Sequence, residues 1–181
     1  MRLVFLVLCA CGVCAARAPA AAEGADEAAP TAGEIVADLN RLGRQLDYRY
    51  ADPVTGAPVT AILSWTFTLA PAGDVLTIAE RYSDDSGFTY GRAVAVPLRR
   101  ALVKHDRDAG AAGPSSGRVL EAAAIICGGE EGCTSVEDAD GTSTRERIYE
   151  ISCEPAVCAA MEGNLRRLVD LARDLPVPPA R

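Results

Sequence analysis

The chain has 181 residues, of which 18 are basic and 25 acidic, so its formal net charge is −7 at pH 7. A chain of this length can bury one sizeable hydrophobic core. The acidic balance disfavours a nucleic acid or an anionic membrane as partner, because proteins bind both through clustered cations.

The first residues have the pattern of a secretory signal peptide. Met1-Arg2 supplies the charged start, an apolar run follows, and Ala20-Ala21-Ala22 forms a small-residue cleavage site before Glu23. The apolar run is too short to span a bilayer, and no later stretch approaches the roughly 20 residues that a spanning helix needs. We therefore predict a leader over 1–22 and a periplasmic or secreted protein, with 16 basic and 25 acidic residues after cleavage.

An alternative interpretation is lipid anchoring through Cys11. Leu8-Cys9-Ala10-Cys11 loosely resembles a lipobox, although Cys9 is unusual in that motif and the apolar run before it is short. The protein would then be a structural lipoprotein tethered through Cys11. Soluble export fits the signal-peptide pattern better.

Order is predicted to begin at Thr31. Residues 23–30 are rich in alanine and read as a disordered tether, followed by one domain over 31–176 and a tail over 177–181. Thr31-Ala32-Gly33-Glu34 has the T-x-x-E form of a capping box. An amphipathic helix is predicted to about Leu46, with one stripe packed on a core: Ile35, Leu39, Leu42 and Leu46.

After a linker punctuated by Pro53 and Pro58, the apolar pattern changes to a period of two. Leu63, Trp65, Phe67 and Leu69 alternate with polar residues, which predicts a half-buried strand. Two more strands are predicted over 76–82 and 88–96, separated by turns at 71–74 and 83–87. These three strands form an antiparallel meander with one strongly apolar face.

The second half of the chain is predicted to add more strands and a closing helix. Pro97–Lys104 reads as one short helix with Leu98 and Leu102 inward, and Asp106–Gly117 as a mobile loop. Strands are predicted over 119–127, 134–137 and 145–153. The last helix has Pro155 in its first turn and ends before Pro176, and its apolar stripe is Cys158, Met161, Leu165, Leu168, Ala172 and Leu175.

Loss of the leader would remove Cys9, Cys11 and Cys14 and leave four cysteines. Four cysteines in an exported chain predict two disulfides, for which three connectivities are possible. The local pairs Cys127–Cys133 and Cys153–Cys158 are favoured, because strands that close a Gly-rich turn bring Cα atoms to a separation that a disulfide can bridge. A four-thiolate zinc site is the alternative, but C-x5-C with C-x4-C is not the usual zinc spacing.

Two apparent catalytic signals do not fit their chemistry. Gly113-Pro114-Ser115-Ser116-Gly117 matches G-x-S-x-G, but a nucleophile elbow needs a strand before it and a helix after it. The only histidine, His105, lies upstream of the serine and among charged residues, so we interpret it as a solvated loop residue. The sequence therefore predicts no catalytic, cofactor-binding or metal-binding residues and no cofactor.

Two clusters of charged residues in the sequence could bind ions of opposite charge. Asp138-Ala139-Asp140-Gly141 resembles part of a calcium loop, but both end ligands are missing, since Val136 would stand first and Arg147 twelfth. A solvated acidic face or a weak cation-binding rim could form from the acids Glu130, Glu131, Glu137, Asp138 and Asp140. A basic cluster could neutralise those acids or bind an anionic partner: Arg99, Arg100, Lys104 and Arg107.

The order of elements resembles a pleckstrin-homology-like fold, and more narrowly small exported bacterial proteins of uncharacterised function. The resemblance covers 61–175 and rests on Trp65-Thr66-Phe67, Ile126-Cys127, Cys133 and the closing helix. It implies an α+β domain with a leading helix, an antiparallel sheet or partly open barrel of about six to seven strands, and a closing helix. The first hairpin turn, Pro71-Ala72-Gly73-Asp74, lacks the cations of phosphoinositide-binding members.

The predicted function is that of an exported, non-enzymatic domain that binds a protein or a small ligand. Its basis is that no nucleophile, base and metal set converges in the sequence. The alternatives are a hydrolase that uses carboxylates and arginine alone, and the structural lipoprotein anchored through Cys11.

Overall fold

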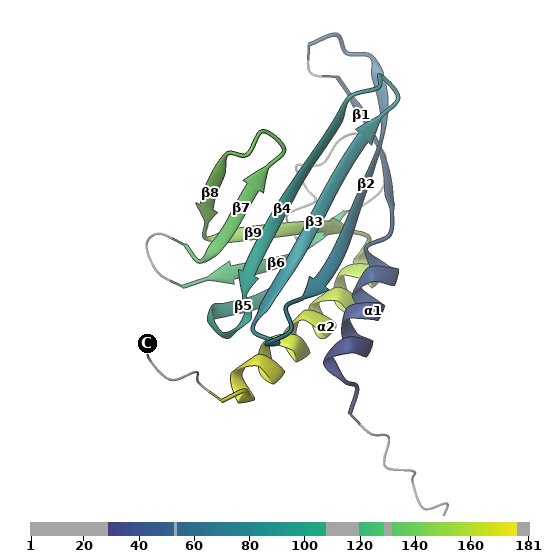
Figure 1. The fold of residues 1–181 in the computed structure, drawn as a ribbon. Helices are drawn as coiled ribbons and strands as arrows, with labels where there is room; N and C mark the ends of the chain where they lie inside the picture. Colours follow the sequence, from purple (N-terminus) through teal and green to yellow (C-terminus); the bar gives the residue numbers. More distant parts are fainter. Residues whose placement is uncertain (1–28, 53, 108–119, 129–131, 177–181) are drawn as a thin grey trace, which may run out of the picture.

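The computed structural model describes residues 29–52, 54–107, 120–128 and 132–176 (Figure 1). The predicted leader over 1–22, the possible lipobox, the G-x-S-x-G segment and the tail over 177–181 lie outside these residues. The described elements are, in chain order, α1 (Ala32–Leu42), β1 (Leu46–Ala51), β2 (Pro58–Leu69), β3 (Val75–Asp84), β4 (Thr89–Pro97), the 3-10 turn η1 (Leu98–Arg100), β5 (Ala101–Asp106), β6 (Glu121–Cys127), β7 (Thr134–Asp138), β8 (Ser143–Glu146), β9 (Ile148–Cys153) and α2 (Pro155–Asp174).

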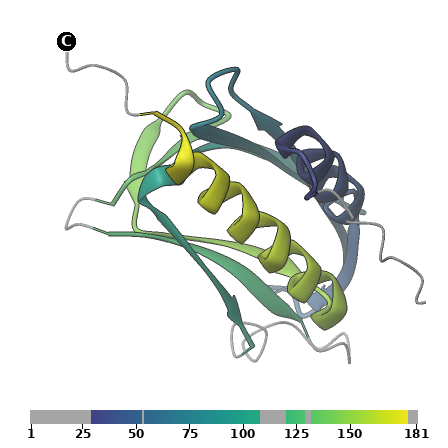
Figure 2. The ribbon, with the colours of Figure 1, turned by 90° about the horizontal axis from the view of Figure 1, so that it is seen from below.

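The strands divide into two antiparallel sheets. Sheet A has six strands in the order β1-β2-β3-β4-β7-β8, and sheet B has three in the order β5-β6-β9. Helix α2 packs on β5 and β6 on one side and on α1 on the other, while α1 also packs on β2 (Figure 2). The predicted α+β class, with a leading helix, antiparallel strands and a closing helix, is confirmed. Neither sheet closes into a barrel.

Helix α1 begins as the sequence predicts. The Thr31 hydroxyl accepts the Glu34 N–H at 3.3 Å, and the Glu34 carboxylate accepts the Thr31 N–H at 2.8 Å. This capping box satisfies two backbone donors that have no partner within the helix. Ile35 and Leu39 are buried against the core.

The predicted extension of this helix to Leu46 is wrong, because the helix stops at Gly43. The Gly43 carbonyl accepts the Trp65 N–H at 2.7 Å, which brings the end of the helix against β2. A Cβ at Gly43 would lie 2.8 Å from the Phe67 ring and 2.9 Å from the Trp65 carbonyl oxygen. Leu46 then begins β1, which the sequence had not indicated.

The three predicted meander strands are confirmed as β2, β3 and β4. Their alternating residues follow the period of two that a sheet with one buried face requires.

Two later predictions are wrong. The helix expected over Pro97–Lys104 is only the turn η1 followed by β5, in which Ala101 and Val103 alternate inward with a two-residue period. The single strand expected over 145–153 is two strands in different sheets, β8 and β9, separated at Arg147.

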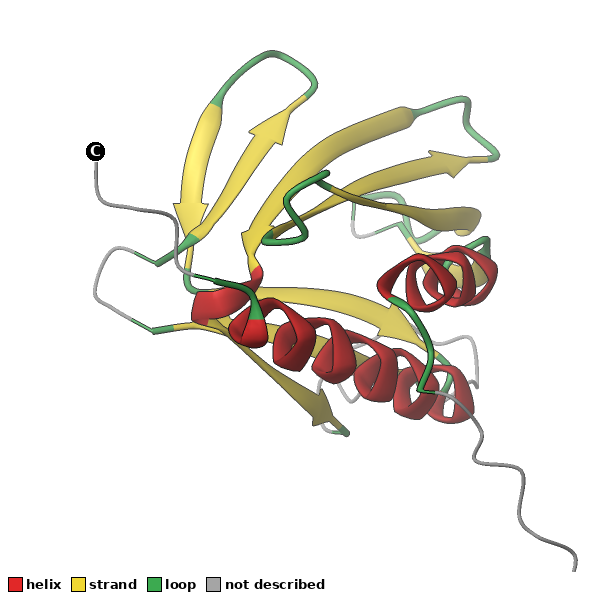
Figure 3. Cartoon of the chain, turned by 60° about the horizontal axis from the view of Figure 1, so that its bottom comes forward, coloured by secondary structure: helices red, strands yellow, loops and turns green. Residues whose placement is uncertain are grey.

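One hydrophobic core lies between the two sheets and around α2. Figure 3 shows how the two sheets and α2 are arranged. Sheet A supplies the inward side chains of β2, β3 and β4, and sheet B those of β5, β6 and β9. Helix α2 contributes the predicted stripe from Cys158 to Ala172. The largest fully buried side chains include Tyr149, Phe67, Leu39, Ile78, Ile125, Met161 and Leu165.

Both disulfides follow the local pairing. Cys127 at the end of β6 is bonded to Cys133 just before β7, and Cys153 at the end of β9 is bonded to Cys158 in the first turns of α2. Each pair has a Cα–Cα distance of 5.3 Å, within the range that a disulfide spans. The first bond joins sheet B to sheet A, and the second fixes the start of α2 on sheet B.

Candidate functional site

The register of sheet A sets a row of polar groups across its inner face. Trp65 of β2 stands opposite Glu80 of β3, Glu80 opposite Arg92 of β4, and Arg92 opposite Asp138 of β7. We call these four residues the polar row. The neighbouring row toward the helices is entirely apolar and buried: Phe67, Ile78, Val94 and Val136.

Glu80 is the centre of the polar row and is only 7% exposed. Its Oε2 accepts hydrogen bonds from the Tyr149 hydroxyl at 2.7 Å, from Arg92 Nη2 at 3.1 Å and Nε at 3.2 Å, and from Trp65 Nε1 at 3.4 Å. Four donors on one carboxylate oxygen satisfy a charge that would otherwise be costly to bury. Because Tyr149 belongs to β9, the carboxylate also links the two sheets.

Arg92 and Tyr149 interact with each other as well as with Glu80. The guanidinium carbon of Arg92 lies 5.2 Å from the centroid of the Tyr149 ring, in cation–π range. Burial disfavours the charged guanidinium, but the charge and hydrogen bonds of Glu80, together with Tyr149 and Tyr90, outweigh this and raise the pKa of Arg92. Burial, and after it the Glu80 charge, raise the pKa of Tyr149 far above its usual value. Tyr149 therefore stays a hydroxyl donor.

Beyond the polar row, away from the helices, the inner face opens into a cleft of about 430 Å³. We call it the aromatic cleft. It lies at the end of sheet A where β1 turns into β2 and β3 turns into β4, at the top of Figure 1. Its walls are three tyrosines, one phenylalanine, one leucine and the polar-row carboxylate: Tyr50, Leu63, Glu80, Tyr82, Phe88 and Tyr90.

Hydrogen bonds hold the rings of the aromatic cleft in place. The Tyr50 and Tyr82 hydroxyls lie 2.9 Å apart, and Tyr82 also donates to the Asp84 carboxylate at 3.0 Å. The Phe88 ring meets the Tyr82 ring edge-on, with centroids 5.8 Å apart. The rings are thus fixed in position, although Phe88 is 58% exposed.

Two further carboxylates accept hydrogen bonds from tyrosines that line the cleft. Asp138 of the polar row accepts the Tyr90 hydroxyl at 2.6 Å, and this hydrogen bond raises the pKa of Tyr90. Asp84 accepts the Ser86 hydroxyl at 2.6 Å, and this bond, with others from the turn, lowers the pKa of Asp84. Both carboxylates are therefore held by neighbouring residues, and Asp84 is a stable anion at neutral pH.

The second carboxylate oxygen of Glu80, Oε1, receives no hydrogen bond from the described residues. All four donors reach Oε2, no described residue donates to Oε1, and Glu80 itself lines the aromatic cleft. No fully buried polar side-chain atom of the described residues lacks a partner, so Oε1, to which none of them donates, keeps some solvent exposure. The arrangement can accept a hydrogen bond or an ion pair at its floor while aromatic rings enclose the donor.

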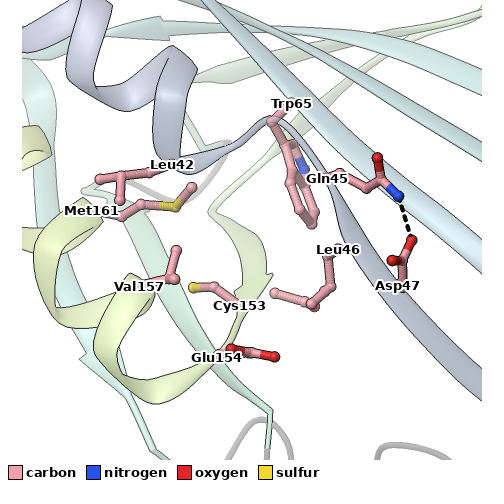
Figure 4. A pocket seen from close by; sticks show the side chains of 10 residues that line it. Leu42, Gln45, Leu46, Asp47, Trp65, Cys153, Glu154, Val157 and Met161 are labelled. Carbon is pink, nitrogen blue, oxygen red and sulfur yellow. Dashed lines mark hydrogen bonds between the residues drawn. The ribbon is translucent and has the colours of Figure 1, made fainter.

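A second cavity of about 160 Å³ lies on the other side of Trp65. Figure 4 shows Trp65, Leu46, Cys153, Val157 and Met161 converging on it. At its edge Gln45 donates to Asp47 at 2.6 Å. This volume is below the roughly 300–1,000 Å³ typical of small-molecule sites, so the aromatic cleft is the stronger candidate.

His105 is not the solvated loop residue that the sequence suggested. It lies in β5 with a 13% exposed side chain, its Nε2 contacts the Glu121 carboxylate, and its Nδ1 lies 3.9 Å from Glu162 of α2. Glu162 is in turn paired with Arg166 at 2.6 Å. The alternation of Ala101, Val103 and His105 turns the imidazole toward α2, so this cluster joins sheet B to the helix.

The predicted acids Glu137, Asp138 and Asp140 lie together on β7 and the turn that follows it, whereas the other predicted charged residues have different surroundings. Of the predicted acidic rim, Asp138 belongs to the polar row, and Glu130 and Glu131 lie outside the described residues. Of the basic cluster, Arg99 donates to the carbonyl oxygens of Leu175 and Pro176 at 2.6 and 2.9 Å, where α2 ends. Among the described residues no three His, Cys, Asp or Glu side chains are placed to hold a metal ion.

Sequence reasoning missed Glu80, Arg92 and Tyr149. One signal was present: Leu76, Ile78, Glu80 and Tyr82 share one face of β3, so Glu80 is a charged residue on an otherwise apolar face. A charge in such a place needs partners, and the register alone supplies Arg92. Tyr149 comes from the other sheet, which no local pattern could reveal.

Comparison with protein families, with curated proteins and with solved structures found no match. The resemblance to a pleckstrin-homology-like fold therefore stays a prediction. Within the described ranges no helix is long and apolar enough to cross a membrane.

Proposed function

We propose that this protein is an exported, non-enzymatic domain that binds a cationic organic group, an ammonium or a guanidinium, in the aromatic cleft. The observation that carries the proposal is the Glu80 carboxylate: four donors occupy Oε2, no described residue donates to Oε1, and Glu80 lines a cleft walled by aromatic rings. A cation that entered the cleft would gain an ion pair at the floor and ring faces around it.

The charge of the cleft favours a cation over an anion. The Glu80 carboxylate lines the cleft, and the carboxylates of Asp84 and Asp138 accept the hydroxyls of two lining tyrosines. Arg92 brings one guanidinium to Glu80. The whole chain carries a net charge of −7, which adds a long-range attraction for cations. The pair of Arg92 and Tyr149 is an internal example of the same contact.

Export is the second part of the proposal. Two disulfides are consistent with an oxidising compartment, such as the periplasm or the cell exterior. A ligand there could be a free ammonium compound or a basic side chain of another protein, since both present the same cationic group.

Fluorescence of Trp65 offers a direct test, because it is the only tryptophan and it donates to Glu80. Tetramethylammonium and N-acetylarginine amide are titrated at constant ionic strength, with tert-butanol and N-acetylcitrulline amide as neutral counterparts. We expect a saturable change with the cations alone. An equal response to the neutral compounds, or no saturable response to either cation, would contradict the proposal.

A pair of variants separates the cleft from the rest of the sheet. Phe88→Ala removes a ring that is 58% exposed and should weaken cation binding roughly two- to tenfold, the range of one cation–π contact. Ile62→Ala, at a side chain that is 41% exposed on the opposite face of sheet A, is the matched control and should leave the affinity unchanged. Hydrolysis of a bound ligand would point instead to a hydrolase based on Glu80 and Arg92.

A further inference from the structure

The outer face of sheet B, the face turned away from α2, carries a second ordered set of side chains. The register places Leu102, Ile126 and Ile148 side by side across β5, β6 and β9. One step along the strands, Lys104, Ala124 and Glu150 form the next row. Each row thus has a central residue on β6 and a flanking residue on each edge strand.

The edge-strand residues of both rows are exposed, whereas Ala124 at the centre is only 3% exposed. Leu102 is 53% and Ile148 52% exposed, so two large aliphatic side chains of one row meet solvent on either side of Ile126. A shallow hollow of about 350 Å³ lies over Ala124 and Ile126, between Lys104 and Glu150. In Figure 2 no described element crosses this side of sheet B.

The rows are complementary to themselves under one particular symmetry. A twofold axis parallel to β6, between two copies packed face to face, places β5 of each copy over β9 of the other. Residues of one row then face residues of the same row. Lys104 meets Glu150 of the second copy, twice, and Leu102 meets Ile148, also twice. A twofold axis across the strands at the level of Ala124 would instead place Lys104 on Lys104.

We propose that the protein forms a symmetric dimer through this outer face, with a second copy of the chain as the partner. Ala124, a small residue at the centre, allows the two sheets to approach to the roughly 10 Å spacing of packed sheets. The aliphatic row supplies apolar contact, and the charged row fixes the orientation. The interface is separate from the aromatic cleft, which lies on sheet A.

Sedimentation equilibrium of the processed, oxidised protein over a concentration series tests the proposal with charge-reversal variants. Lys104→Glu would place two like-charged contacts in the interface, and so would Glu150→Lys. Each alone should weaken the dimer roughly tenfold or more. Mixed together, the two variants pair Glu at 104 with Lys at 150 of the other chain, and Glu150 with Lys104, so a heterodimer of near wild-type affinity should form.

The mixture is the decisive measurement, because misfolding of either variant cannot produce recovery. Arg167→Glu, an exposed position on α2, is the matched charge reversal away from the face and should leave the dimer unchanged. A monomer at every concentration would overturn the proposal. A dimer that both single variants leave intact would place the interface elsewhere and overturn it as well, as would two weakened variants that fail to recover on mixing.

Discussion

The inner face of sheet A has two halves of opposite chemistry, built by the same strands. On the helix side of the polar row, Phe67, Ile78 and Val94 are almost fully buried. On the other side, Tyr82 and Tyr90 line an open cleft and keep their hydroxyls bonded to carboxylates. Positions two residues apart on the same strand therefore belong to the buried core on one side and to the open cleft on the other, and Glu80 with its donors lies between them.

The same substitution in the two halves should have very different effects. Phe67→Ala leaves a cavity in the core and should lower the free energy of unfolding by about 3–5 kcal/mol. Phe88→Ala, at a ring that is 58% exposed, should cost under about 1 kcal/mol. Urea unfolding of the oxidised proteins measures both, and equal losses would contradict the division of the face.

A substitution in the polar row, which separates the two halves, should have the next largest effect on the free energy of unfolding. Glu80→Gln leaves the Arg92 guanidinium without its partner, at a cost of about 2–3 kcal/mol, reduced from a fully buried pair because Arg92 is 25% exposed. The double variant Glu80→Gln with Arg92→Met should lose less than the sum of its single changes. Asp38→Asn, which breaks an exposed pair with Arg41, is the control and should cost under about 0.5 kcal/mol.

Removing the disulfide beside α2 should lower the free energy of unfolding and leave the cation affinity of the cleft unchanged. The double change Cys153→Ser and Cys158→Ser opens a six-residue ring, which the loop-entropy model values at about 2 kcal/mol. Chemical denaturation measures the loss, and the cation titration of Trp65 measures the cleft. Loss of cation affinity in protein that is still folded would show that the two halves are coupled.

Tyr149→Phe tests how the buried Tyr149 hydroxyl affects the pH dependence of stability. At pH 7 the change removes one donor from Glu80 and should cost about 1–2 kcal/mol. The unfolded tyrosine ionises near pH 10 while native Tyr149 keeps its proton, so the unfolded state then binds fewer protons. Wild-type stability should therefore fall above pH 10 by up to about 1.4 kcal/mol per pH unit from this group.

The measurement is the difference in free energy of unfolding between wild type and Tyr149→Phe from pH 7 to 11. We expect it to shrink as pH rises, since the variant lacks this ionisation. The Phe88→Ala difference should stay constant over the same range. A Tyr149→Phe difference that also stays constant would show that the burial of this hydroxyl has no energetic effect.

Local patterns predicted the elements whose contacts are local. The capping box at Thr31, the alternation from Leu63 to Leu69 and the stripe of α2 each record a single helix or strand, and each is present. The errors arose where tertiary contacts decide. Helix α1 stops at Gly43 because β2 passes too close for a side chain, and β5 was taken for a helix because Leu98 and Leu102 are four residues apart.

The candidate site was harder to predict because its parts come from distant positions. Glu80 and Arg92 are neighbours through the β3–β4 register, but Tyr149 is 69 residues from Glu80 in the chain. The cysteine pairing was accessible because each pair spans five or six residues. The distance along the chain between contacting residues, rather than their type, limited how much of the site could be predicted.

The strand order has a consequence for the route by which the chain folds. Sheet A continues from β4 directly to β7, so β5 and β6 form in the other sheet before the chain returns. Hairpins among β1–β4 need only short loops, whereas pairing Arg92 with Asp138 must close a loop of more than forty residues. The β1–β4 meander can thus assemble early, and the polar row is completed only when β7 pairs with β4.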